Sequence, residues 1–229
     1  NYYAGVHRRQ GDGFRKSRSR YNVNDLTANV TAKVGEKNEW RFFLNGFTEY
    51  SDTPGGLSQA QWEQDPEQSV NPHDFFEARR FSTAISYKRS FDETNSLTTS
   101  IYGSYLKRDW WLDNRNADPT KRKFTSALRD IPTVGLFSDY ERTNTLFGKE
   151  NKLLAGIRLH TDITHEVSVA GDEMGKKAGK TTANSANTVA VVEGYVFDEF
   201  HITDKLNINP GLRYTFVNYD KEDYFRNNW

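Results

Sequence analysis

Apolar and polar residues alternate along most of this chain with a period of two, which places successive side chains on opposite faces of a β-strand. In residues 26–34 every even-numbered residue is apolar and every odd-numbered residue is polar. The same alternation recurs in residues 80–88, 97–108, 153–162 and 206–216. Residues 131–147 are ambiguous, and residues 188–201 are apolar on both parities around Val189–Val192. The pattern predicts an all-β chain of about nine strands.

The connections between these segments alternate in length. Short turns are predicted at residues 35–38, 92–95, 148–151 and 202–205, and long connections at 10–20, 51–73, 113–130 and 168–187. If neighbouring strands are antiparallel, the short turns lie at one end of the sheet and the long connections at the other. Bacterial outer-membrane barrels have this asymmetry, with short periplasmic turns and long extracellular loops. The pattern therefore favours an antiparallel transmembrane β-barrel.

A soluble β-sandwich remains an alternative, because its strands also alternate between an apolar core and a polar surface. Strand length separates the two folds. Soluble strands cluster near 5–6 residues, whereas a tilted membrane-spanning strand needs about 9–11. Residues 74–91 and 96–112 predict strands longer than either value. Because single-chain bacterial barrels have an even number of strands, a chain of about nine strands is not expected to close into a barrel by itself.

The same parity predicts which side chains face lipid and which face the lumen. Ile157, Leu159, Leu212 and Tyr214 are expected to face lipid, and Arg158, Arg213 and Thr31 the lumen.

Composition excludes several classes of site. There is no cysteine, so neither a disulfide nor a thiolate metal site can form. The 31 basic and 31 acidic residues balance, which gives no overall field for nucleic acid. The five histidines form no HExxH spacing, and no serine lies in a GxSxG sequence. We therefore expect no enzyme activity and no metal or cofactor held directly by side chains.

Several sequence segments resemble one family of membrane proteins. They are DTPGGLSQAQ at residues 52–61, DPEQS at 65–69, PHD at 72–74, GDGFR at 11–15, LLAGIRLH at 153–160 and NPGLRY at 209–214. Together they resemble the TonB-dependent receptors, with most similarity to the ferric dicitrate branch of the siderophore receptors. The matches are spread in order along nearly the whole chain.

The resemblance implies a location in the bacterial outer membrane and the uptake of a ferric chelate such as ferric citrate, energised through TonB. Iron would enter only as part of the chelate. Lipid, lipopolysaccharide and TonB would be further partners, TonB through an N-terminal part that is not included in residues 1–229. On this hypothesis the chain is a partial barrel, the middle section of a larger one, and so a fragment of the barrel domain without its plug and closing strands. A passive porin-like barrel and a soluble β-domain that binds protein or sugar are the alternatives.

An anionic chelate needs cations at the outer mouth of the barrel, because arginine pairs bidentately with carboxylates and stays charged. The candidates on the outer halves of strands and in the loops are Arg79, Arg80, Arg108, Arg115, Arg122 and Arg129. Arg80 and Arg108 fall on the lumen parity. The alternative for each arginine is a solvated rim charge or a contact with lipopolysaccharide.

Overall fold

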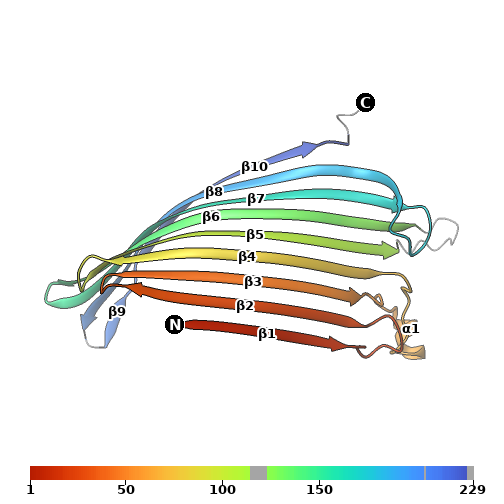
Figure 1. The fold of residues 1–229 in the computed structure, drawn as a ribbon, viewed down its shortest axis with the longest axis horizontal. Helices are drawn as coiled ribbons and strands as arrows, with labels where there is room; N and C mark the ends of the chain where they lie inside the picture. Colours follow the sequence, from red (N-terminus) through yellow and green to blue (C-terminus); the bar gives the residue numbers. More distant parts are fainter. Residues whose placement is uncertain (114–122, 204, 226–229) are drawn as a thin grey trace.

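In the computed structural model, which describes residues 1–113, 123–203 and 205–225, the chain forms one antiparallel sheet of ten strands (Figure 1). The strands are β1 (Tyr2–Gly11), β2 (Tyr21–Val34), β3 (Asn38–Asp52), β4 (Phe75–Ser90), β5 (Asn95–Asp113), β6 (Phe124–Leu146), β7 (Lys149–Gly171), β8 (Gly179–Thr203), β9 (Leu206–Ile208) and β10 (Gly211–Asp223). One short helix, α1 (Gln59–Gln64), lies between β3 and β4. The all-β prediction is confirmed.

Each strand from β1 to β8 pairs with the next strand in sequence, and β10 pairs with β8. Within the described residues β1 forms one edge of the sheet, and β9 and β10, which both pair with β8, form the other, so the sheet is open. Residues 206–216 were expected to form one strand, but the structure divides them between β9 and β10 at Asn209–Pro210. Proline has no N–H to donate to a β-ladder. The Pro210 carbonyl still accepts a bond from the Asp198 N–H at 2.9 Å, which keeps the chain beside β8.

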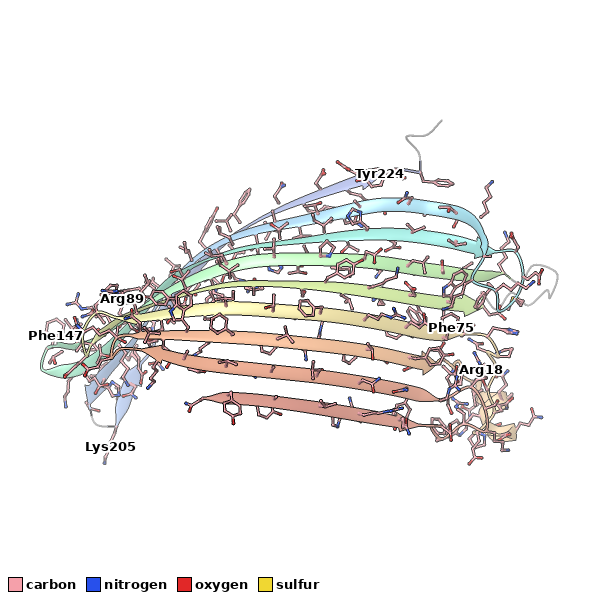
Figure 2. All side chains as sticks on the ribbon, viewed as in Figure 1. Arg18, Phe75, Arg89, Phe147, Lys205 and Tyr224 are labelled. Carbon is pink, nitrogen blue, oxygen red and sulfur yellow. The ribbon has the colours of Figure 1, made fainter. Side chains whose placement is uncertain are left out.

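The short turns and the long connections lie at opposite ends of the sheet, as predicted. Figure 2 places Phe147 and Lys205 at one end and Arg18 and Phe75 at the other. Helix α1 lies at the same end as Arg18 and Phe75, which is the end of the long loops (Figure 1). We call these two ends the short-turn end and the long-loop end.

Two of the long connections are shorter than predicted. Residues 168–187 were expected to be irregular, but β7 continues to Gly171 and β8 starts at Gly179, which leaves residues 172–178 as the loop. Residues 179–187 carry no apolar alternation, and their strand conformation comes from pairing with β7 and, at residues 185–187, also with β10. Residues 124–130 likewise belong to β6. Residues 114–122 lie outside the described part of the chain.

The sheet has one apolar face and one polar face. A row of directly paired residues on the apolar face crosses eight strands, namely Val30, Phe42, Ile85, Ile101, Leu136, Leu159, Val192 and Phe216. The adjacent row on the polar face is Thr31, Arg41, Ser86, Ser100, Phe137, Arg158, Glu193 and Thr215. Ile157, Leu212 and Tyr214 share the apolar face, and Arg213 shares the polar face. The predicted division of these residues between two faces is confirmed.

Charged residues mark the height of the apolar band on β4. Arg79 and Arg89 lie on the apolar face ten residues apart. The residues between them on that face are Phe81, Thr83, Ile85 and Tyr87. Ten residues of strand advance by about 34 Å, and a tilt of about 40° reduces the vertical height to about 26 Å. This height matches the roughly 25 Å apolar band of a transmembrane β-barrel.

A small buried cluster lies on the apolar-face side of the long-loop end. It contains Phe75, Trp111 and Phe124, which are 7%, 2% and 1% exposed. Met174 from the loop at 172–178 packs against it. A single sheet has no second layer that could bury its side chains. At the long-loop end, the loop at 172–178 covers this cluster instead.

The connection between β3 and β4 is folded on itself. Gly55 has a φ of 81°, a left-handed conformation that glycine adopts without strain, next to Pro54. The Pro54 carbonyl accepts a bond from the Val70 N–H at 3.0 Å. Helix α1 was not predicted, although Ser58 and Gln61 form a capping box that marks its start. No described helix is long and apolar enough to cross a membrane.

The loop between β1 and β2 packs against this connection. Arg15 donates to the Gln68 carbonyl at 2.7 Å, and Lys16 forms an ion pair with Asp65 at 2.8 Å. The hydrogen bond from Lys16 lowers the pKa of Asp65, and the same bond raises the pKa of Lys16. The Lys16 side chain is exposed and the Asp65 side chain is about one-third exposed, so the pair orders the two loops more than it stabilises the sheet.

Candidate ligand-binding surface

Three of the predicted arginines lie together on the polar face near the long-loop end. Arg108 on β5 is directly opposite Arg129 on β6. Arg80 on β4 is opposite Leu106, two residues before Arg108, so Arg80 and Arg108 are diagonal neighbours. Diagonal pairs of this kind are separated by about 7–8 Å. We call Arg80, Arg108 and Arg129 the arginine row.

Arg129 already has an anionic partner in the sheet. Its Nε donates to Glu166 Oε2 on β7 at 2.5 Å, and the two residues are directly paired in register. Both side chains are about one-third exposed, at 34% and 29%. The Glu166 carboxylate therefore neutralises the charge of Arg129.

Arg108 lacks such a partner. Its side chain is half-buried, and its buried Nε has no hydrogen-bond partner among the described residues. Like charges placed directly opposite one another in a sheet are destabilising, and Arg129 is the residue opposite Arg108. The buried Nε of Arg108, a donor without a hydrogen-bond partner, also lowers the stability of the folded sheet. An anion that binds at Arg108 would offset both costs.

Arg80 is held by a polar network on the neighbouring strands. Its Nη2 donates to Asn45 Oδ1 at 3.1 Å, and Asn45 Nδ2 donates to Asp25 at 3.1–3.2 Å. The guanidinium also lies 5.4 Å from the centre of the Phe47 ring. Phe47 breaks the apolar alternation of β3 because it faces the polar side, where it supports Arg80. The network orients Arg80 and leaves it exposed.

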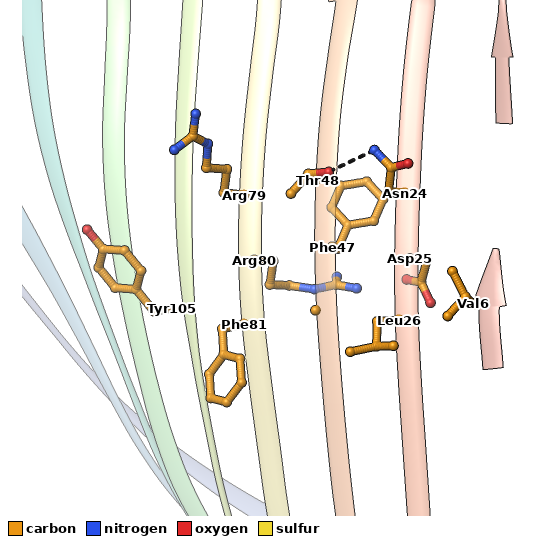
Figure 3. Close-up of a pocket in the computed structure, with 11 residues that line it drawn as sticks. Val6, Asn24, Asp25, Leu26, Phe47, Thr48, Arg79, Arg80, Phe81 and Tyr105 are labelled. Atoms are coloured by element: carbon orange, nitrogen blue, oxygen red, sulfur yellow. Dashed lines mark hydrogen bonds between the residues drawn. The ribbon is translucent and has the colours of Figure 1, made fainter. Parts of the chain in front are cut away.

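The remaining predicted arginines do not join this row. Arg79 lies on the apolar face, where it is opposite Lys107. Figure 3 shows Arg79 extending toward β5 and Arg80 toward β3. Arg115 and Arg122 lie outside the described residues.

The polar face also carries a second network, closer to the middle of the sheet, that was not predicted. The Tyr102 hydroxyl lies 2.8 Å from His160 Nδ1, and His160 Nε2 lies 2.8 Å from Asp162 Oδ2. Arg158 donates to the Tyr102 hydroxyl at 3.3 Å. Because Asp162 accepts the bond from Nε2, Nδ1 is free to accept from Tyr102. These polar groups satisfy one another, in contrast to Arg108.

None of these networks resembles a metal site. Among the described residues, no three histidine, aspartate or glutamate side chains converge in a way that could hold a metal ion. The arginine row is suited instead to binding carboxylate or another oxyanion by charge-assisted hydrogen bonds.

The family model described as "TonB dependent receptor-like, beta-barrel" matches residues 2–229. The chain belongs to this family. The match covers the whole sheet described above, and it confirms the resemblance that the sequence segments carried.

Solved structures of siderophore receptors share the fold of this TonB-dependent receptor barrel. The unliganded ferric citrate transporter FecA superposes with a TM-score of 0.88 at 18% identity, covering 98% of this chain and 34% of FecA. The open form of the ferric-catecholate import receptor Fiu from E. coli K12 gives a TM-score of 0.74 at 13% identity, covering 97% of this chain and 40% of Fiu. FpvA from P. aeruginosa, bound to a heterologous pyoverdine, gives 0.76 at 11%, covering 97% and 33%.

At these identities the likeness shows the fold. The chain spans between a third and two-fifths of the length of these receptors. Its ten strands therefore correspond to one part of the wall of a larger barrel. In such a barrel the polar face lines the lumen and the apolar face meets lipid.

Proposed function

We propose that this chain forms part of the wall of an outer-membrane receptor that takes up an anionic ferric chelate such as ferric citrate, energised through TonB. Membership of the TonB-dependent receptor family supports the general activity. The arginine row supports the choice of an anionic ligand.

The observation that carries the proposal is the state of Arg108. It is half-buried, faces Arg129 and has a donor without a partner among the described residues. Arg129 is committed to Glu166, and the network of Tyr102, His160 and Asp162 is internally satisfied. Within the arginine row, Arg108 is thus the cation that gains most from an incoming carboxylate.

Arg80 would act as the second contact. It lies one diagonal step from Arg108 on the same face, which allows two carboxylates of one chelate to be bound together. Asn45 would orient Arg80, and Glu166 would hold Arg129 away from the ligand. Iron would be recognised through the charge and shape of its chelate.

Uptake of radiolabelled ferric citrate by cells that express the intact receptor tests this function. The proposal predicts uptake that requires TonB and falls about tenfold or more in Arg108→Ala at a citrate concentration below saturation. Arg79→Ala is the matched control, because it removes an arginine of the neighbouring strand β4, opposite Lys107, from the other face of the sheet. Uptake by this variant is expected to equal that of wild type.

Uptake that persists without TonB would contradict energised transport and support a passive barrel. TonB-dependent uptake of a neutral iron chelate, with none of ferric citrate, would contradict the anionic ligand. An equal loss in Arg79→Ala and Arg108→Ala would show that the polar face is not the surface that binds the chelate.

A further inference from the structure

The loop between β7 and β8 folds back over neighbouring strands at the long-loop end (Figure 1). It comprises residues 172–178 and is closed at its base by a bond from the Asp172 N–H to the Ala178 carbonyl at 3.0 Å. Its side chains reach β4, although β5 and β6 lie between β4 and β7 in the sheet. We call residues 172–178 the strap.

Two polar or backbone contacts fix the far end of the strap. Lys177 Nζ pairs with Glu77 Oε2 on β4 at 3.0 Å. Gly175 has a φ of 79° and lies against His73, so close that a Cβ added at Gly175 would be 2.8 Å from His73 Cδ2. The ion pair is partly exposed and contributes little by itself. The strap therefore needs an apolar contact to stay in place.

Met174 supplies that apolar contact. It is the only methionine in the 229 residues and the only large apolar side chain of the strap. It packs against the cluster of Phe75, Trp111 and Phe124, none of which is more than 7% exposed. A thioether in contact with aromatic rings gains a favourable sulfur–aromatic interaction. The other residues of the strap are exposed, so Met174 is its anchor.

The thioether of Met174 is half-buried, which leaves it within reach of a small oxidant such as hydrogen peroxide. A lone pair of Sδ attacks one peroxide oxygen, and the S–O bond forms as the O–O bond breaks. The leaving oxygen takes up the proton of the transferred oxygen and departs as water. Sulfur loses two electrons and becomes the sulfoxide, and the peroxide gains them.

The sulfoxide no longer suits the cluster. Oxidation converts a flexible apolar side chain into a polar one. The sulfoxide oxygen is a hydrogen-bond acceptor that loses its water when it is buried among aromatic rings, and this desolvation is unfavourable. The oxidised side chain therefore favours solvent over the contact with the cluster.

We propose that Met174 is a reversible oxidation site that controls the strap. The thioether holds residues 172–178 on the aromatic cluster, and oxidation by a peroxide releases them. Methionine sulfoxide reductases reverse the step, because they take two electrons from a dithiol and release the sulfoxide oxygen as water. The inference concerns the strap alone and does not depend on which chelate is carried.

Limited trypsin digestion of the detergent-purified intact receptor tests whether oxidation opens the strap. Lys176 and Lys177 are exposed cleavage sites within it, and cleavage in a loop follows the population of its open form. Loss of a sulfur–aromatic contact corresponds to about two- to tenfold in the opening equilibrium. Desolvation of the sulfoxide adds to this effect.

After treatment with hydrogen peroxide, cleavage at Lys176 and Lys177 should rise about tenfold or more. Peptide mass spectrometry identifies the oxygen added to Met174. Treatment with methionine sulfoxide reductases and dithiothreitol should remove that oxygen and restore the original cleavage rate.

Two variants at position 174 separate the sulfur from the shape of the side chain. Met174→Leu is the matched control, because leucine fills the same site without an atom that peroxide oxidises. Its strap should be cleaved slowly with or without peroxide, which separates Met174 from any other methionine of the intact receptor. Met174→Gln places a polar side chain of similar length at the site, and its strap should be cleaved about tenfold faster without peroxide.

Gly175→Ala opens the strap by a route that leaves the sulfur intact. The added Cβ would meet the His73 ring, and a φ of 79° is strained for alanine. Cleavage should rise several-fold without peroxide. Met174 should also be oxidised several-fold faster in this variant, because its thioether is then more exposed.

Three results would overturn the proposal. Oxidation of Met174 with no change in cleavage would show that the sulfur does not hold the strap. Survival of Met174 at peroxide concentrations that oxidise a free methionine peptide would remove the oxidation site. An equal acceleration in wild type and Met174→Leu would place the sensitive group elsewhere in the receptor.

Discussion

Arg79 and Arg80 are consecutive residues of β4 that lie on opposite faces of the sheet. Arg79 pairs across the sheet with Lys107 on the apolar face, and Arg80 donates to Asn45 on the polar face. The strand alternation thus gives two arginines at the same height two different surroundings. It also gives a matched pair of variants, Arg79→Ala and Arg80→Ala, that separates effects on the lipid side from effects on the lumen side.

The assignment of the two faces can be tested with spin labels on the intact receptor in lipid. A label at position 157 should be reached by a lipid-soluble quencher, because Ile157 lies on the apolar face. It belongs to the same cross-strand row as Gly194 on β8 and Tyr214 on β10. A label at position 213 should be shielded from it. The reverse accessibility would refute the barrel orientation.

On the same basis, Ile157→Arg should lower the free energy of unfolding by about 2–4 kcal/mol if position 157 lies near the bilayer midplane.

Asn45 should be important for stability because it is 6% exposed and makes several hydrogen bonds. Its amide joins Asp25 to Arg80, so Asn45→Ala leaves both with unsatisfied groups. We expect a loss of about 1–3 kcal/mol in the free energy of unfolding, measured by denaturant titration. Asn29→Ala is the control, since Asn29 is a half-buried residue of the polar face without a side-chain hydrogen bond in the described structure. Equal losses in the two variants would contradict the role of the network.

The turn between β4 and β5 should respond to acid at an unusually low pH. The Asp92 carboxylate accepts bonds from the Thr94 hydroxyl and N–H and from the Asn95 N–H, each at 2.8 Å, and these bonds lower its pKa to about 2. A lowered pKa means that the carboxylate stabilises the turn above its unfolded pKa of about 3.9. That contribution is lost as the pH falls through about 2.

Hydrogen-exchange protection factors of the Thr94 and Asn95 amides provide the measurement. They should be constant above about pH 4 and should fall between pH 4 and pH 2, because protonation removes the charged acceptor. Asp92→Asn should remove this dependence, since its amide does not titrate in that range. A wild-type turn whose protection is unchanged down to pH 2 would contradict the proposed role of the carboxylate.

Much of this fold could be predicted from local sequence. The strict alternation in residues 26–34 identified a strand and its faces, and the same parity assigned Arg158 and Leu159 correctly. Residues 179–187 could not be assigned in this way. They contain Thr, Ala, Asn and Ser without alternation, and their strand conformation depends on backbone bonds to β7 and β10, which are remote in sequence.

The candidate surface was only partly predictable for the same reason. Parity alone separates Arg79 from Arg80, because Arg79 shares the parity of the apolar Phe81. Arg108 is directly opposite Arg129, and Arg129 is directly opposite Glu166, only because of the register between β5, β6 and β7. Register is set by the pairing of whole strands and by the turns, and no residue type in the sequence marks it.

The dissociation constant of ferric citrate for the intact receptor tests the central claim most directly. A charge-assisted bond contributes about 1.5–3 kcal/mol, so Arg108→Ala should weaken binding about ten- to a hundredfold. Arg108→Lys should recover part of the loss, because it keeps the charge but loses the bidentate geometry. The Arg80→Ala/Arg108→Ala double variant should bind more weakly than either single variant, while Arg79→Ala binds like wild type. An unchanged dissociation constant in the double variant would contradict the claim that the arginine row binds the chelate.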